Sequence, residues 1–213
     1  MKRLLLVIAL LLICLCTYLG YLYLREDDSS KSIVEAIEKA RGDNYVNYII
    51  HQQPVNNGMM VFFLRNFNDG QIQVLSGFVK KTRQGWKWSY GGSFGATNVR
   101  LDLSPEEAKG ESFYSSYFPS TTGTEYDSPF PMIYGVILNP DISRIVVRDY
   151  ITGLERQTDV VEINKHFKLF YVLIDDAQGK KFDIIAYDHD GGILRTETID
   201  QGLQAQSGTS TVK

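Results

Sequence analysis

The sequence predicts an α+β protein built mainly of antiparallel β-strands. It places a transmembrane helix at the N-terminus, then a helix-plus-four-strand meander unit, and a β-sandwich-like unit in the C-terminal half. Three observations predict this class. An uncharged apolar run lies near the start, a short segment with the period of an amphipathic helix follows, and ten later stretches are rich in Val, Ile, Phe and Tyr with turn residues between them.

The composition limits the class of protein further. The chain has 213 residues, of which 44% are hydrophobic and 22% charged, with two Cys and a net charge of −3. These values exclude a disordered chain, a disulfide scaffold and a strongly basic nucleic-acid-binding protein. No nucleic-acid partner is therefore expected.

The N-terminal segment predicts an uncleaved membrane anchor. Residues 4–24 contain no charge, and 21 helical residues span roughly 31 Å, close to the ~30 Å hydrocarbon core of a bilayer. A cleaved signal peptide has a shorter apolar region that ends in small residues, whereas this run ends in bulky ones and carries an interfacial belt of Tyr18, Tyr21 and Tyr23. Lys2 and Arg3 precede the run, so we expect a cytoplasmic N-terminus and an extracytoplasmic remainder.

The charge and the cysteines of the exported part follow from this placement. Cys14 and Cys16 both lie inside the apolar run, so the exported part has no cysteine. Without Lys2 and Arg3, 20 basic and 25 acidic residues remain, a net charge of −5. This net charge disfavours binding to anionic lipid or wall polymer through bulk electrostatics.

The first exported unit is expected to be one helix followed by a meander. Residues 29–41 have helical spacing, with Ser32 and Glu35 as a capping box and Gly42 as the end. The predicted strands are residues 45–50, 59–65, 71–80 and 86–93, separated by Gly-containing turns at 56–58, 68–70 and 83–85. The helix is expected to cover one face of the sheet.

The rest of the chain reads as a linker, a second β-rich unit and a tail. Ser104 and Glu107 with Pro105 predict a short helix that ends near Gly110 or runs to Tyr117. The expected strands of the second unit are residues 132–138, 144–149, 158–163, 167–174, 181–187 and 193–199. The predicted organisation is therefore residues 1–28 (cytoplasmic start, anchor and linker), 29–95 (helix and meander), 96–130 (linker with short helix), 131–200 (β-rich domain) and 201–213 (disordered tail). Whether the two β-rich units are separate domains stays open.

The C-terminal half carries a resemblance. Its turn and strand positions lie in Tyr134-Gly135-Val136-Ile137, Asn139-Pro140-Asp141-Ile142, Ile145-Val146-Val147 and Ala186-Tyr187-Asp188-His189-Asp190-Gly191-Gly192-Ile193-Leu194. In these segments the chain resembles uncharacterised single-pass membrane-anchored envelope proteins of low-GC Gram-positive bacteria. The resemblance covers roughly the last 75 residues and includes no catalytic motif. It implies an envelope location and a sandwich-like fold.

One group of residues is a candidate cation or acid–base site. If residues 167–174, 181–187 and 193–199 form a meander, His166 lies beside the turn that contains Asp188, His189 and Asp190. Carboxylates and imidazoles at such a turn suit a hard cation or proton transfer. The same turn also fits an ordinary Asp-Gly hairpin. No His or Cys spacing of a common zinc site occurs, so neither a metal site nor a cofactor is predicted.

A second group is a candidate binding patch. In a regular strand Trp86, Trp88 and Tyr90 share one face, and Lys87 lies on the other. Exposed, these residues suit a carbohydrate or an anionic polymer. Buried, the three rings are a core face beside a solvated basic turn.

The sequence favours a membrane-anchored extracytoplasmic binding or scaffold protein of the cell envelope. Its expected partners are the membrane and another envelope or membrane protein. No nucleophile motif such as GxSxG occurs, and the protein is not expected to be an enzyme. Two alternatives stay open: an envelope enzyme that uses an unrecognised His or carboxylate site, and a membrane-tethered regulator that acts through a partner membrane protein.

Overall fold

The computed structural model describes residues 2–24, 28–66, 72–92, 97–100, 103–126, 128–164, 167–175 and 180–200. In these residues it has three helices and thirteen strands, and every strand pairing is antiparallel. The predicted α+β class, rich in antiparallel strands, is confirmed. The predicted tail, residues 201–213, lies outside the described residues.

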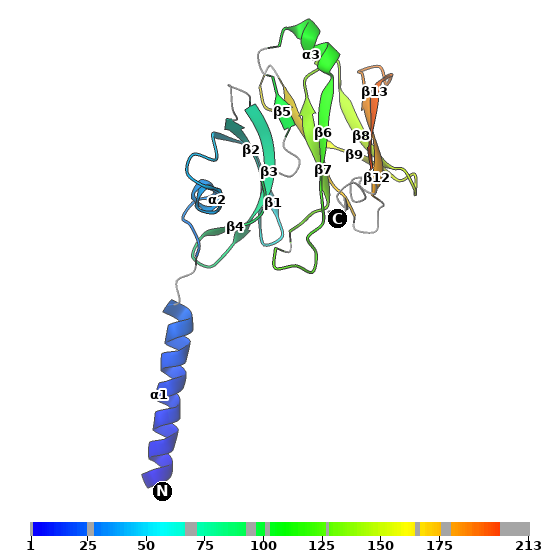
Figure 1. Ribbon diagram of the computed structural model, residues 1–213. Coiled ribbons are helices and arrows are strands. Elements are labelled where there is room, and N and C mark those ends of the chain that lie inside the picture. The colour runs from blue at the N-terminus through cyan, green and yellow to red at the C-terminus, as the bar shows by residue number, and fades with distance from the viewer. Residues whose placement is uncertain are drawn as a thin grey trace, which may run out of the picture.

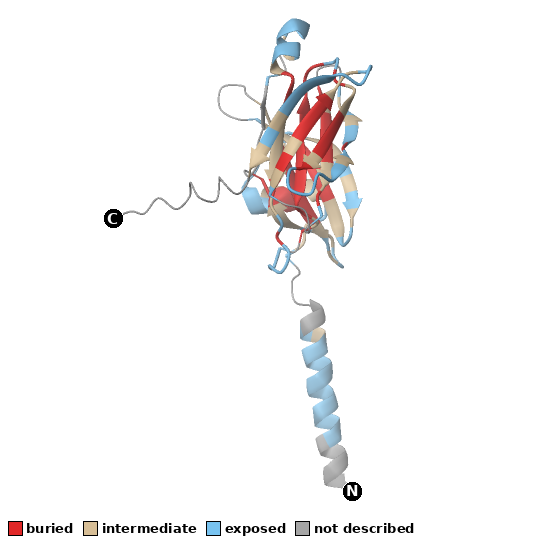
Figure 2. Ribbon diagram, turned by 90° about the vertical axis from the view of Figure 1, so that its right-hand side faces the viewer, coloured by how far each residue is buried: buried red, intermediate tan, exposed pale blue. Residues whose placement is uncertain are grey.

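The first helix, α1 (Lys2–Leu24), extends away from the β-layers in both views (Figures 1 and 2). Its apolar side chains are exposed around the helix, for example Leu10, Leu11 and Ile13. Among the residues whose side chains are described, which for α1 are residues 8–21, no helix is long and apolar enough to cross a membrane.

The first sheet contains the predicted meander. Its strands are β1 (Tyr48–Val55), β2 (Gly58–Asn66), β3 (Ile72–Lys81), β4 (Trp86–Gly91) and β5 (Thr97–Val99). The order is β1-β2-β3-β4, and β5 pairs with the end of β3 that β4 leaves free. Strand β1 runs past the predicted end at residue 50 and includes Pro54. Proline is tolerated there because β1 is an edge strand.

The second helix, α2 (Ile33–Arg41), covers one face of the first sheet, as predicted. The hydroxyl of Ser32 accepts a hydrogen bond from the N–H of Glu35, whose carboxylate accepts one from the N–H of Ser32, and the helix ends at Gly42 with φ of 104°. Ala36 and Ile37 are buried against the sheet. The sheet residues in this cluster are Val61, Phe63, Leu75 and Val79.

Two further sheets form the sandwich. The middle sheet has the order β10 (Asp159–Glu162), β11 (Lys168–Leu173), β7 (Met132–Ile137), β6 (Phe113–Phe118). The outer sheet has the order β13 (Ile193–Asp200), β12 (Lys181–Tyr187), β8 (Arg144–Asp149), β9 (Glu155–Gln157). Strands β11 and β12 lie in different sheets, so residues 167–199 do not form the meander on which the predicted position of His166 depended.

The region predicted as a linker contains a strand. Helix α3 (Pro105–Glu111) has the predicted capping box between Ser104 and Glu107. It ends at Ser112, whose φ of 65° directs the chain into β6. Strand β6 pairs with β7 along its full length. The alternative in which the helix runs to Tyr117 was therefore wrong.

The elements stack in four layers: α2, the first sheet, the middle sheet and the outer sheet (Figure 1). One buried cluster joins the first and middle sheets, with Phe62 packed against Tyr134 at a ring-centroid distance of 5.8 Å. A second cluster joins the middle and outer sheets through Phe170 and Phe182. The buried strands lie at the centre of the molecule in Figure 2, and the two β-rich units share a core.

Candidate functional site

The turn between β12 and β13 is held by its own first residue. Oδ1 of Asp188 accepts hydrogen bonds from the N–H groups of Asp190 (2.9 Å) and Gly192 (2.7 Å), and the N–H of Asp188 donates to the carbonyl of Gly192 (2.9 Å). His189 and Asp190 lie exposed at the tip. The carboxylate of Asp188 is thus part of an Asx-type hairpin turn. This geometry favours the ordinary hairpin over a cation loop.

The proposed fourth member of that group, His166, lies outside the described residues. The prediction that placed it beside Asp188 rested on a meander, and β11 pairs instead with β7 and β10. Elsewhere in the described chain, no three His, Cys, Asp or Glu residues come close enough to hold a metal ion.

The aromatic residues of β4 do not share a face, which corrects the prediction. The pairing with β3 passes from Phe78↔Tyr90 to Val79↔Trp88, so Ser89 is an extra residue in a β-bulge. The bulge reverses the alternation of side chains. Trp86 and Trp88 therefore lie on the α2 side of the sheet, whereas Tyr90 packs into the cluster shared with the middle sheet.

Both Trp side chains are half-buried and covered by cations. The Nζ of Lys81 lies 4.2 Å from the ring centroid of Trp86, and the guanidinium carbon of Arg41 lies 5.5 Å from that of Trp88. Lys87 is exposed on the strand. The Trp rings close the edge of the α2 layer, which favours the core interpretation over a carbohydrate platform.

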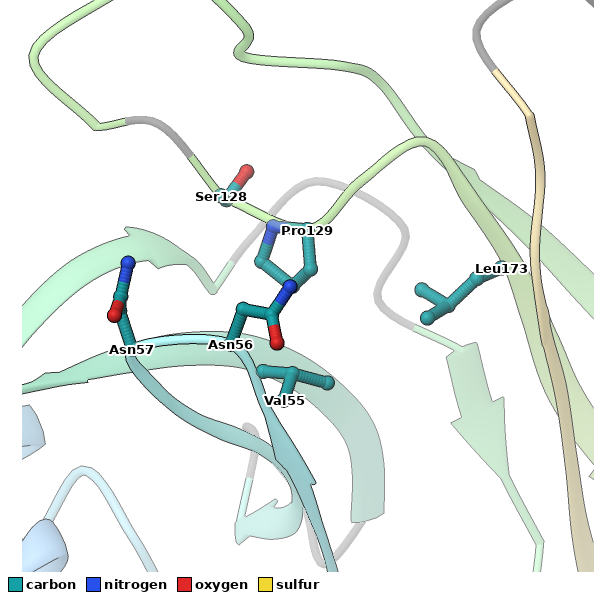
Figure 3. Close-up of a pocket in the computed structure, with 6 residues that line it drawn as sticks. All are labelled: Val55, Asn56, Asn57, Ser128, Pro129 and Leu173. Carbon is teal, nitrogen blue, oxygen red and sulfur yellow. The ribbon is translucent and has the colours of Figure 1, made fainter.

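A groove opens between the first sheet and the sandwich (Figure 3). Its volume is about 520 Å³, and it is lined by Val55, Asn56, Asn57, Ser128, Pro129 and Leu173. Leu173 of the middle sheet faces Val55, Asn56 and Pro129 across an open space. None of these six side chains is charged. Two amides among apolar walls suit a neutral, polar ligand such as a peptide segment.

The loop of residues 119–131, which provides one wall of this groove, is fixed at several points. The hydroxyl of Thr121 accepts a hydrogen bond from the N–H of Ser128 (2.9 Å), and the two hydroxyls bond to each other. Lys80 of β3 donates to the carbonyl of Glu125 (3.1 Å), and Ser89 of β4 donates to that of Tyr126 (2.7 Å). The loop leaves the middle sheet but is held by the first sheet, so the groove wall is preformed.

Further along the same two strands, His51, Gln53 and Tyr171 form a polar joint between the sheets. His51 and Gln53 lie on the same strand as Val55, and Tyr171 lies two residues before Leu173. The hydroxyl of Tyr171 donates to Oε1 of Gln53 (3.0 Å) and lies 3.3 Å from Nε2 of His51. Because the single hydroxyl proton is used by Gln53, Nε2 of His51 is the donor to Tyr171.

Both titratable groups of the joint are held neutral. Burial lowers the pKa of His51, and the negative charge of Asp159 opposes this shift only in part. Burial also raises the pKa of Tyr171, with a further contribution from Asp159. A neutral imidazole and a protonated phenol make the joint a hydrogen-bonding element at neutral pH.

Sequence reasoning missed both the joint and the groove. The predicted strand ended at residue 50, directly before His51, whereas β1 continues to Val55. The only local signal is the run His51-Gln52-Gln53 before the Asn-Asn-Gly turn. The partners Tyr171 and Leu173 are more than 100 residues away in the chain.

Comparison with known proteins gives no relative from which a role can be transferred. No family model, curated protein or solved structure matches this chain.

Proposed function

We propose that this chain is a membrane-anchored, extracytoplasmic binding or scaffold module of the cell envelope. Helix α1 is the anchor, and the four-layered body outside the membrane binds a partner. The resemblance to envelope proteins of low-GC Gram-positive bacteria implies the same location.

The observation that carries the proposal is the exposure of α1. Leu10, Leu11 and Ile13 are 62%, 64% and 62% exposed, on a helix that is apolar on every side. A helix of this kind is stable only where its side chains are removed from water. The uncharged sequence continues beyond residues 8–21 to residues 4 and 24, the length that matches a bilayer core. Lys2 and Arg3 at its start favour a cytoplasmic N-terminus.

The groove is the feature that supports a binding role. Its walls are preformed, so a ligand does not have to order them when it binds. The amides of Asn56 and Asn57 offer donors and acceptors, and Val55 and Leu173 offer apolar contact. We therefore expect the partner to be a neutral, partly apolar segment of another envelope or membrane protein.

In-cell photo-crosslinking tests the binding role. A photoreactive amino acid at Asn56, on the groove, is expected to give a discrete adduct with one protein. The same amino acid at Glu106, an exposed residue of α3, serves as the matched control and is expected to give none. Adducts at neither position, or the same adducts at both, would count against the groove as a binding site.

A further inference from the structure

The surface nearest the anchor is fixed by the path of the chain. Four peptide units separate Leu24, the last residue of α1, from Asp28, and they span at most about 14 Å. Two residues later, the N–H of Ser30 donates to the carbonyl of Trp86 (2.7 Å), and the N–H of Trp86 donates to the carbonyl of Ser30 (2.8 Å). The turn between β3 and β4, residues 82–85, is thereby tied to the segment that leaves α1, as Figure 1 shows.

This surface is basic although the exported part is acidic overall. Residues 72–92 contain four basic residues and no acidic one. Lys81, Arg83 and Lys87 are exposed around the turn. Lys31 is also exposed and follows Ser30, which contacts the turn at Gly85. We refer to Lys31, Lys81, Arg83 and Lys87 as the basic turn.

Among the residues that the structure describes, two carboxylates near the basic turn are Asp28 and Glu35, and both have partners in the segment of residues 28–39. Oδ1 of Asp28 lies 2.5 Å from Nζ of Lys39. Oε2 of Glu35 accepts hydrogen bonds from the N–H groups of Lys31 (3.0 Å) and Ser32 (3.2 Å). The negative charge of Asp28 also acts on Lys87, and beyond the hydrogen bond with Lys39 this lowers the pKa of the Asp28 carboxyl further. In this part of the described chain, Lys31, Lys39, Lys81, Arg83 and Lys87 nevertheless outnumber Asp28 and Glu35, so the surface keeps a net positive charge.

We propose that the basic turn binds the phosphate groups of anionic phospholipids in the membrane that holds α1, and so presses the body against the bilayer in one orientation. This inference rests on the proposed anchor. The short connection to Leu24 allows the turn to come within about 10 Å of the headgroups, the distance over which electrostatic attraction acts before salt screens it. Each basic side chain at an anionic surface contributes about fivefold to the occupancy of the docked state.

The short connection between α1 and the body favours lipid over wall polymer as the ligand. A headgroup layer lies at the end of α1 in every copy of the protein, whereas a wall polymer would have to reach the same surface from outside. The net charge of −5 would by itself repel such a surface, so the docking depends on where the basic residues lie.

Reconstitution of the full chain tests the inference. In a Cys14→Ala, Cys16→Ala background, Gln84→Cys at the exposed turn carries a fluorophore, and the vesicles carry a quencher on the lipid headgroup. We expect stronger quenching in vesicles of phosphatidylcholine mixed with phosphatidylglycerol than in phosphatidylcholine alone. The difference is expected to disappear at high salt and in the triple variant Lys81→Gln, Arg83→Gln, Lys87→Gln.

A matched triple variant controls for the loss of charge. Lys109→Gln, Arg144→Gln, Arg148→Gln removes the same charge from α3 and the outer sheet, and it is expected to keep the quenching difference. Equal quenching in the two lipid mixtures, or an equal loss in both triple variants, would overturn the inference. Flotation of the protein with phosphatidylcholine vesicles tests the anchor separately. A protein that floats but shows no lipid-dependent quenching refutes the docking and leaves the anchor intact.

Discussion

At the scale of single residues, His51 shows how the first and middle sheets are joined. Its ring lies 5.9 Å from the ring of Phe62 and 5.5 Å from that of Tyr171, between centroids. The imidazole thus packs against both aromatic rings and also donates a hydrogen bond to Tyr171. Protonation would place a positive charge in this partly desolvated contact, and the negative charge of Asp159 offsets the cost only in part.

The joint predicts a pH dependence of stability. Because the pKa of His51 is lower in the folded chain than its unfolded value of about 6.5, the unfolded state binds more protons at and below that pH. The contribution of His51 is therefore complete above about pH 6.5 and is lost as the pH falls toward the folded pKa. We expect the melting temperature of the full chain in detergent to decrease as the pH is lowered below about 6.5.

Two substitutions test whether His51 causes this pH dependence. His51→Gln is expected to lower the melting temperature at neutral pH, because a hydrogen bond worth about 1 kcal/mol is lost, and to flatten its pH dependence below pH 6.5. His189→Gln, in the exposed β12–β13 turn, is the control and is expected to leave both unchanged. If His51→Gln keeps the wild-type pH dependence, the joint does not titrate as described.

At the scale of elements, strand β4 depends on two glycines. The ring of Trp88 lies across Gly77 of β3 and Gly91 at the end of β4, which are paired. A Cβ on Gly91 would lie 2.6 Å from the carbonyl oxygen of Ser76 and 2.9 Å from Cη2 of Trp88, and its φ is 139°. Only glycine fits this position without a backbone shift.

Gly91→Ala is therefore expected to destabilise the fold by about 1–3 kcal/mol or more, through overlap with the backbone and an unfavourable φ. Gly110→Ala is the matched control, because nothing lies within 4 Å of its Cβ and it lies in α3. It is expected to leave stability unchanged or to raise it by up to about 1 kcal/mol. Chemical denaturation of the two variants measures the difference. If Gly91→Ala leaves the free energy of unfolding unchanged, the described bulge and the packing of Trp88 are contradicted.

The elements also show which features the sequence was able to predict. Strands β8 and β12 have their predicted bounds, because alternating apolar residues and local turns determine them. The bulge at Ser89 was not predictable, because it arises from the pairing with β3 rather than from β4 itself. Strand β6 was missed because it follows α3 after one residue, Ser112, whose positive φ has no clear sequence signal.

At the scale of the whole molecule, long-range packing decides both the layers and the candidate site. The order of strands in the sandwich separates β11 from β12, and this removed the argument that brought His166 to the Asp188 turn. The same packing brings Val55 and Leu173 to opposite sides of one groove. Local patterns predict the strands, but only their sheet order shows which side chains meet.

The molecule combines an apolar helix with a layered body that carries a basic turn and an uncharged groove. Under the proposed function α1 lies in lipid and the basic turn lies beside its exit, and the groove lies between the first two sheets. Its central claim is that α1 spans the membrane and that the body lies outside the cytoplasm. The cysteines make this claim easy to examine, because Cys14 and Cys16 are both in α1.

Thiol labelling in intact cells tests this claim most directly. Ile151, in the turn between β8 and β9, is 75% exposed, and Ile151→Cys in the Cys14→Ala, Cys16→Ala background provides a single accessible thiol. The wild-type chain, whose thiols lie within α1, is the control and is expected to stay unlabelled. The account predicts that a membrane-impermeant maleimide labels Ile151→Cys in intact cells and that the labelled protein sediments with the membranes. Labelling only after lysis, or labelled protein in the soluble fraction, would contradict it.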